Sequence, residues 1–192
     1  MLKVMIIDSE IERRKPLKQS LIDNGFEVVA HVESDIHLQR KCFEIKPDIV
    51  IIDTDSPNRD TLENICVMSM HDPRPIVMFT HDGDKEQIKL ATQAGVSAYV
   101  VGTIPSERLT PVIDAAIARF EEFKSLRTEL SETKLKLDER KVVERAKGLL
   151  MKQRGLDEEA AYEMLRSMAM KKNMKLADLS QQLIEAASML IV

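Results

Sequence analysis

Residues 48–57 read DIVIIDTDSP, a run of β-branched apolar residues that ends in acids, hydroxyls and a proline. A short, unbroken apolar run bounded by turn residues is typical of a strand buried on both faces of a parallel sheet. Four more apolar runs of this length occur in the first hundred residues, at 2–7, 26–32, 75–79 and 98–101. The sequence therefore predicts five short strands in its first half.

Segments of helical length separate these strands, at about 11–24, 35–46, 60–70 and 84–94. Short apolar strands that alternate with amphipathic helices are typical of an α/β fold with a parallel sheet covered on both faces. In such folds ligands collect outside the carboxyl ends of the strands. The residues expected there are Asp8, Ser9, Asp53, Asp55, Thr80 and Gly102.

Two carboxylates from separate strands, with a hydroxyl opposite, suit a hard cation and a phosphoryl group. We expect no bound metal, with Mg²⁺ at Asp8 and Asp53 as the less favoured alternative. The four histidines are scattered and offer no convergent ligand set, so we expect no histidine metal site. The sequence has no dinucleotide or nucleotide-phosphate fingerprint, and we expect no cofactor.

The first 120 residues resemble the receiver domain of two-component response regulators, a flavodoxin-like fold. The resemblance aligns Asp53 with the phospho-accepting aspartate, Pro57 with its usual follower, Thr80 with the switch hydroxyl and Tyr99 with the switch aromatic. It implies that this half of the chain is the sensing end.

Two positions depart from the receiver pattern. Ser9 stands where the family has a second acid that binds magnesium, and Gly102 stands where it has a lysine that pairs with the phosphoryl charge. A phosphoryl group adds about −1.5 to −2 charges beside Asp8 and Asp55. We therefore expect phosphorylation of Asp53 to be disfavoured. The alternative to a phosphorylation site is an acidic pocket that supports the fold or contacts a partner.

After Gly102 the strand pattern stops and a long helix is expected, with Thr110 as N-cap, Pro111 as first helical residue and an end near Arg154. Its middle carries apolar residues at a spacing of seven: Phe123, Leu130 and Leu137. This weak heptad pattern predicts either a short dimerising coiled coil or a strut against a neighbour. Two further amphipathic helices, at about 157–172 and 176–191, complete a predicted three-helix bundle.

The net charge of −4 hides two unlike halves. Residues 1–118 hold 13 basic and 19 acidic residues, whereas residues 119–192 hold 15 basic and 13 acidic ones. Within 134–154 eight basic residues face three acids. A basic bundle is a candidate surface for a polyanion, although a solvated helix face is the commoner explanation.

The last third also carries specific motifs: AKGLLM at 146–151, EEAAYEMLRSMA at 158–169 and NMKLADL at 173–179. Together they resemble the ANTAR domain of AmiR- and NasR-type transcription antiterminators, over about 130–190. With the degenerate receiver, the chain looks most like the NasT-type antiterminators of nitrate assimilation. The predicted RNA-binding residues are Arg140, Lys141, Arg145, Ala146, Lys147, Gly148, Lys152, Arg154, Arg166, Lys171, Lys172 and Lys175.

Three of the small or aromatic residues in these motifs have two interpretations. Ala146 and Gly148 leave room either for tight helix packing or for an RNA backbone. Tyr162 suits either the core of the bundle or stacking on a base.

The resemblance implies a regulator and not an enzyme: a homodimer that binds paired leader-mRNA hairpins and prevents terminator formation. It also implies control by a sequestering sensor that resembles a nitrate-binding protein. The competing hypotheses are a phosphorylation-dependent response regulator that binds DNA or RNA, and a flavodoxin-like enzyme that uses Asp8 and Asp53. A DNA reader is disfavoured because the last helix has no Lys or Arg after Lys175.

We predict a receiver-like domain at 1–118, a helical coiled-coil connector at 119–137 and a three-helix RNA-binding domain at 138–192. With two cysteines, no apolar run of membrane-spanning length and no signal-peptide pattern, we expect a cytoplasmic protein without a membrane segment.

Overall fold

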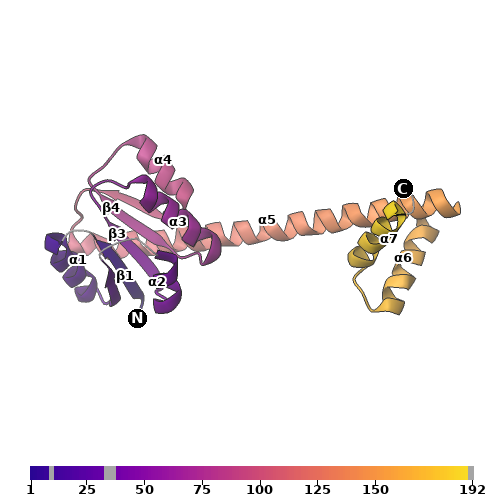
Figure 1. Ribbon diagram of the computed structural model, residues 1–192. Helices are drawn as coiled ribbons and strands as arrows, with labels where there is room; N and C mark the ends of the chain where they lie inside the picture. The colour runs from indigo at the N-terminus through magenta and orange to yellow at the C-terminus, as the bar shows by residue number, and fades with distance from the viewer. Residues whose placement is uncertain (9–10, 33–37, 190–192) are drawn as a thin grey trace. The chain divides into compact units, whose positions relative to one another are not determined.

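The computed structural model describes residues 1–8, 11–32 and 38–189. They form five strands and seven helices (Figure 1). In chain order these are β1 (Lys3–Asp8), α1 (Ile11–Asp23), β2 (Glu27–Val32), α2 (Leu38–Ile45), β3 (Ile49–Asp53), α3 (Arg59–His71), β4 (Ile76–Thr80), α4 (Lys85–Ala94), β5 (Ala98–Val101), α5 (Ser106–Arg154), α6 (Glu158–Lys172) and α7 (Leu176–Met189).

The chain divides into two compact units, Met1–Lys124 and Ser125–Val192, which meet within α5. In the first unit all five strands are parallel, in the order β2-β1-β3-β4-β5. Each predicted strand lies within one residue of the observed one, and the predicted five-stranded parallel fold is confirmed. None of the helices in the described residues is long and apolar enough to cross a membrane.

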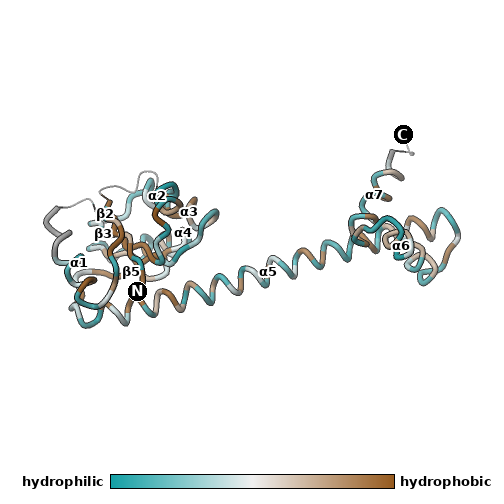
Figure 2. Tube along the Cα trace, turned by 90° about the horizontal axis from the view of Figure 1, so that it is seen from below, coloured by the Kyte–Doolittle hydropathy of each residue, from teal (hydrophilic) through white to brown (hydrophobic). Residues whose placement is uncertain are grey.

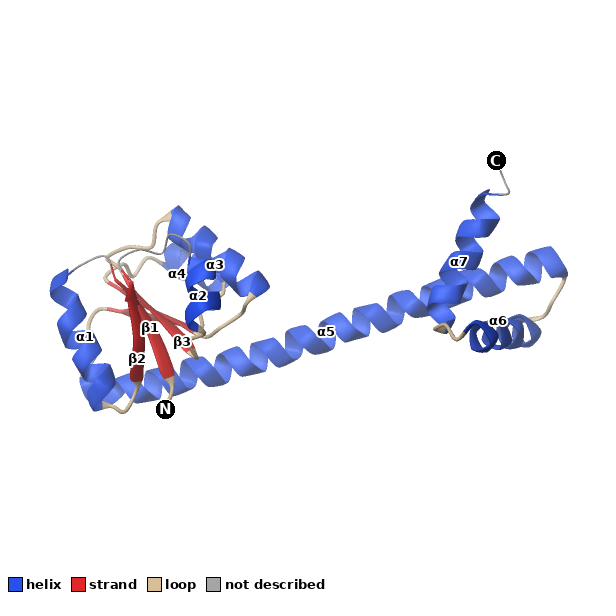
Figure 3. Ribbon diagram, turned by 60° about the horizontal axis from the view of Figure 1, so that its bottom comes forward, coloured by secondary structure: helices blue, strands red, loops and turns tan. Residues whose placement is uncertain are grey.

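Side chains alternate along the strands and build a separate core on each face of the sheet. Along β3, Val50 and Ile52 face α2, α3 and α4, while Ile49 and Ile51 face α1 and the start of α5. Figure 3 shows the two sets of helices on opposite sides of the strands, and Figure 2 shows the strands as the most hydrophobic part of the unit. Because both faces are covered, the central strands read as unbroken apolar runs.

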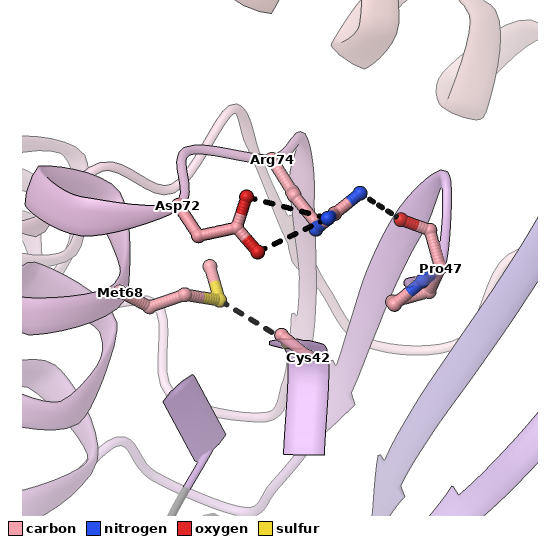
Figure 4. Close-up of polar contacts among 5 residues, drawn as sticks. All are labelled: Cys42, Pro47, Met68, Asp72 and Arg74. Atoms are coloured by element: carbon pink, nitrogen blue, oxygen red, sulfur yellow. Dashed lines mark hydrogen bonds and ion pairs between the residues drawn. The ribbon is translucent and has the colours of Figure 1, made fainter. Parts of the chain in front are cut away.

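A polar clamp joins the loops at the amino ends of β3 and β4. The guanidinium of Arg74 donates to both carboxylate oxygens of Asp72, at 3.0 and 3.3 Å, and to the carbonyl of Pro47 at 2.6 Å (Figure 4). Beside it the thiol of Cys42 lies 3.4 Å from the sulfur of Met68. Burial raises the pKa of this thiol to about 11, so Cys42 stays protonated and unreactive at neutral pH.

Helix α5 begins at Ser106, one turn before the predicted start, so the prediction of an N-cap at Thr110 is wrong. Two contacts hold the earlier turn: the amide of Asn24 donates to the carbonyl of Ser106 at 3.2 Å, and the buried Leu109 enters the core. Pro111 therefore sits inside the helix. It is exposed there, where water can serve the carbonyl that lacks its usual N–H partner.

The second unit consists of the last part of α5 with α6 and α7. Its core is formed by Ala146 and Leu150 from α5 and by Ala161 and Leu165 from α6, all of them buried. Asp157 caps α6 by accepting the N–H of Ala160 at 2.8 Å. The helix ends at a left-handed residue, Asn173, and the turn leads directly into α7.

One cation is held inside this unit. The side chain of Lys147 is 8% exposed, and its ammonium donates to Glu144 at 2.8 Å and to Glu158 at 2.7 Å. These hydrogen bonds raise the pKa of Lys147 and lower that of Glu158. Since Glu158 opens α6, the pair joins α5 to α6. Lys147 was predicted as an RNA contact; its charge is instead used within the unit.

We expect Glu158→Gln to lower the thermal unfolding midpoint at pH 7 more than Glu159→Gln does. Both changes remove one charge from the first turn of α6, but only the first removes the negative charge that pairs with the ammonium of Lys147. The effect should be small, because the carboxylate of Glu158 is 71% exposed and therefore well screened.

The stabilisation by the Lys147–Glu158 pair should depend on pH in a defined direction. The pKa of Glu158 is lowered by folding, so the stabilisation is present above the ordinary glutamate pKa and is lost as the pH falls through the lowered value. The difference between wild type and Glu158→Gln should therefore shrink as the pH falls below the ordinary glutamate pKa and disappear once Glu158 is protonated in both the folded and the unfolded protein. Equal midpoints for the two variants at pH 7 would contradict a stabilising bond.

Candidate functional site

The acidic residues predicted at the strand ends lie together in the first unit. Asp8 and Asp53 are direct partners in the register of β1 and β3, so they sit on adjacent strands at the carboxyl edge of the sheet. Asp8 is buried and Asp53 is partly buried. Ser9, predicted beside them, lies outside the described residues. Within the described residues, no group of three His, Cys, Asp or Glu side chains could hold a metal ion.

A cavity of about 280 Å³ opens next to Asp53. Thr80 and Gly102 line it together with apolar residues that include Phe79 and Leu109. Gly102 adopts a φ of +79°, where a glycine is favoured, and a Cβ at this position would have no neighbour within 4 Å. The residue thus contributes no side chain to the cavity.

The hydroxyl of Thr80 forms hydrogen bonds to two loops at the acidic edge of the sheet. Its hydroxyl donates to the carbonyl of Asp55 at 2.7 Å and accepts the N–H of Asp82 at 3.1 Å. The hydroxyl of Ser56 donates to the Asp82 carboxylate at 2.6 Å, and that of Tyr99 donates to the Asp82 carbonyl at 2.8 Å. The bond from Ser56 lowers the pKa of Asp82. The loop after β4 is thus held from three elements.

The predicted RNA-binding residues of α5 fall on different faces of the second unit. Lys141, Arg145 and Lys152 are exposed on the side away from the core. Gly148 lies among them, and a Cβ at this position would meet no neighbour outside the helix backbone within 4 Å. The tight packing considered for Gly148 is therefore absent. Ala146, by contrast, is fully buried, so that residue packs in the core and cannot touch RNA.

Other predicted cations lie on α5 and α6. Arg154 approaches the sulfur of Met164 at 3.7 Å, close to the core. Arg166 is exposed in the middle of α6. Lys171 and Lys172 occupy its exposed last turn, where they suit the negative end of the helix.

Some of the basic side chains of this unit line a groove of about 660 Å³. It is lined by Lys136 and Arg140 from α5, by Tyr162 from α6, and by Lys175 just before α7. Tyr162 is 42% exposed, so it is not a core residue. The predicted site did not include Lys136 or Tyr162. The four-residue spacing of Lys136 and Arg140 was a usable signal, since it places both on one side of a helix.

Two family models match the chain. The response regulator receiver domain matches residues 4–114, and the ANTAR domain matches residues 131–184. The groove and its basic residues fall inside the second match.

Similar proteins cover both halves. The transcriptional regulatory protein PdtaR of Mycobacterium tuberculosis is 30% identical over 183 residues, which are 95% of this chain and 89% of that protein. The nitrate regulatory protein of Klebsiella oxytoca is 40% identical over 63 residues, 33% of this chain but 16% of that protein.

Solved structures share the fold of the first unit. The signal receiver domain of a modulated diguanylate cyclase from Desulfovibrio desulfuricans aligns with a TM-score of 0.56 at 20% identity, over 63% of this chain and 97% of that one. The similarity to PdtaR, which spans both parts of the chain, agrees with the two family matches. The chain belongs to the response regulators, with a receiver domain followed by an ANTAR domain.

Proposed function

We propose that this protein is an RNA-binding antitermination regulator that binds paired hairpins in leader mRNA and prevents a terminator from forming. The observation that carries the proposal is the ANTAR match at 131–184, together with the groove inside it. Cations from α5 and from the turn before α7 converge on that groove, which is the charge arrangement that a nucleic-acid backbone requires. RNA loops suit such a surface because their unpaired bases are accessible.

The receiver domain, in this proposal, transmits its signal without phosphorylation of Asp53. Gly102 provides no cation for a phosphoryl group, and the hydroxyl of Thr80 is already bonded to the Asp55 carbonyl. We propose instead that a sensor resembling a nitrate-binding protein sequesters the chain, as in a NasT-type system. The similarity to the Klebsiella nitrate regulatory protein supports this assignment to nitrate or nitrite assimilation.

We expect the full-length protein to bind a leader hairpin RNA, and duplex DNA of equal length not to displace it at the same salt concentration. Arg140→Ala and Lys175→Ala should each weaken binding and reduce the salt dependence by about one phosphate contact. Fluorescence anisotropy of labelled RNA measures both effects. Displacement by DNA would favour the alternative, a phosphorylation-dependent regulator that reads DNA.

Two variants serve as controls for that measurement. Lys85→Ala removes an exposed cation from the receiver domain and should leave the affinity unchanged. Asp53→Ala should also be silent, because no phosphoryl group is required. A large loss of RNA affinity in Asp53→Ala would contradict the proposed control of the receiver domain.

We also propose that the protein acts as a homodimer through the middle of α5. Phe123, Leu130 and Leu137 recur every seven residues, and each is more than half exposed in the single chain. Leu126 extends the same stripe. A second copy of the helix would cover these side chains in a coiled coil and would present two ANTAR domains to two hairpins.

The double variant Leu130→Glu/Leu137→Glu should abolish this dimer, since it places charges in the apolar seam. Leu135→Glu is the matched control, because Leu135 is similarly exposed but lies on the other side of the helix. Sedimentation velocity reports the mass of each protein. A wild type that stays monomeric at high concentration, or a control that dissociates equally, would contradict the coiled coil.

A further inference from the structure

The wall of the ANTAR groove contains an aromatic ring that the core does not use. The neighbours of Tyr162 on α6, Ala161 and Leu165, are fully buried and fill the centre of the bundle. Tyr162 itself lies on the flank of the helix, lines the groove and keeps 42% of its surface exposed. An aromatic face open to a groove is a platform on which a flat ring can stack.

Cations surround this platform from more than one element. Lys136 and Arg140 lie one turn apart on α5, and Lys175 approaches from the turn before α7. Arg166 follows Tyr162 by four residues and therefore occupies the same flank of α6. A ring that enters the groove thus has positive charge around it, which suits a nucleotide with a phosphate on each side.

The groove also contains acceptors. Glu139 is partly buried and lines it between Lys136 and Arg140. Glu144 lines it too, but its carboxylate already accepts the ammonium of Lys147 at 2.8 Å. A carboxylate accepts hydrogen bonds from an exocyclic amine and repels a carbonyl edge. Glu139 therefore favours adenine, guanine or cytosine over uracil.

We propose that this groove binds one unpaired base of an RNA hairpin loop. The base stacks on Tyr162, its amine donates to Glu139, and its flanking phosphates contact Lys136, Arg140 and Lys175. This inference rests on the proposed RNA-binding function and adds to it a position in the loop at which the identity of the base matters.

The test uses a pool of RNA hairpins with one common stem and a randomised loop. Selection with the full-length wild type should enrich loops that share an amino-bearing base at one position. Tyr162→Phe, which keeps the ring, should enrich the same loops. Tyr162→Leu should lose the preference at that position and bind the selected hairpin about tenfold more weakly or worse, as expected for the loss of one stacked base.

A fluorescent base then locates the contact. With 2-aminopurine at the selected position, wild type and Tyr162→Phe should quench its emission, whereas Tyr162→Leu should not. Glu139→Gln is a second variant outside the core and should relax the discrimination against uracil. Arg145→Gln, on the opposite face of α5, is the control for general electrostatics and should keep the preference.

The possible failures are distinguishable. A wild type that enriches no hairpin over duplex DNA refutes RNA binding itself. A wild type that enriches hairpins, together with a folded Tyr162→Leu protein of equal affinity and equal preference, refutes the base subsite alone. Circular dichroism establishes whether Tyr162→Leu is folded; if it is not, unchanged discrimination by Glu139→Gln refutes the subsite.

Discussion

A single helix, α5, contributes side chains to two hydrophobic cores. Near its start Leu109, Ile113 and Ala116 are buried against one face of the receiver sheet, and near its end Ala146 and Leu150 are buried against α6. Neither core is complete without its part of the helix. Most of the residues between them are exposed, and several of the exposed apolar ones recur with the period of a coiled coil. Both folding units and the proposed dimer therefore depend on one continuous stretch of sequence.

The receiver half was readable from sequence because its structure is local and repetitive. In β3 and β4 every position that faces a core is apolar, so the strands appear as unbroken runs such as IVII at 49–52. The predicted range 84–94 ends where α4 does, and the residue that follows is Gly95, whose φ of +114° few other residues adopt. The predicted start of α5 was wrong because Thr110-Pro111 has a sequence typical of a helix start. The contacts that stabilise the earlier turn come from Asn24, which is far away in the sequence.

The site in the ANTAR half was harder to read because charge alone does not reveal its neighbours. Lys147 looked like one more cation on a basic helix, but its ammonium is bound by Glu158, which belongs to another helix. Conversely, Tyr162 sits among apolar residues in the sequence, yet its ring faces a groove that only the packing of three helices creates. The spacing of the motifs located the domain; the direction of each side chain required the structure.

The acidic receiver and the basic groove explain why the net charge of −4 says little about the partner. An RNA approaching the protein is repelled by one half and attracted by the other, so the distribution of charge determines where binding occurs. The central claim, antitermination, is tested most directly by single-round transcription in vitro. The template carries the leader and terminator of the operon that the protein regulates. The account predicts that added protein raises the fraction of full-length transcript, and that Arg140→Ala raises it less. A termination efficiency unchanged at protein concentrations that saturate the leader RNA would contradict it.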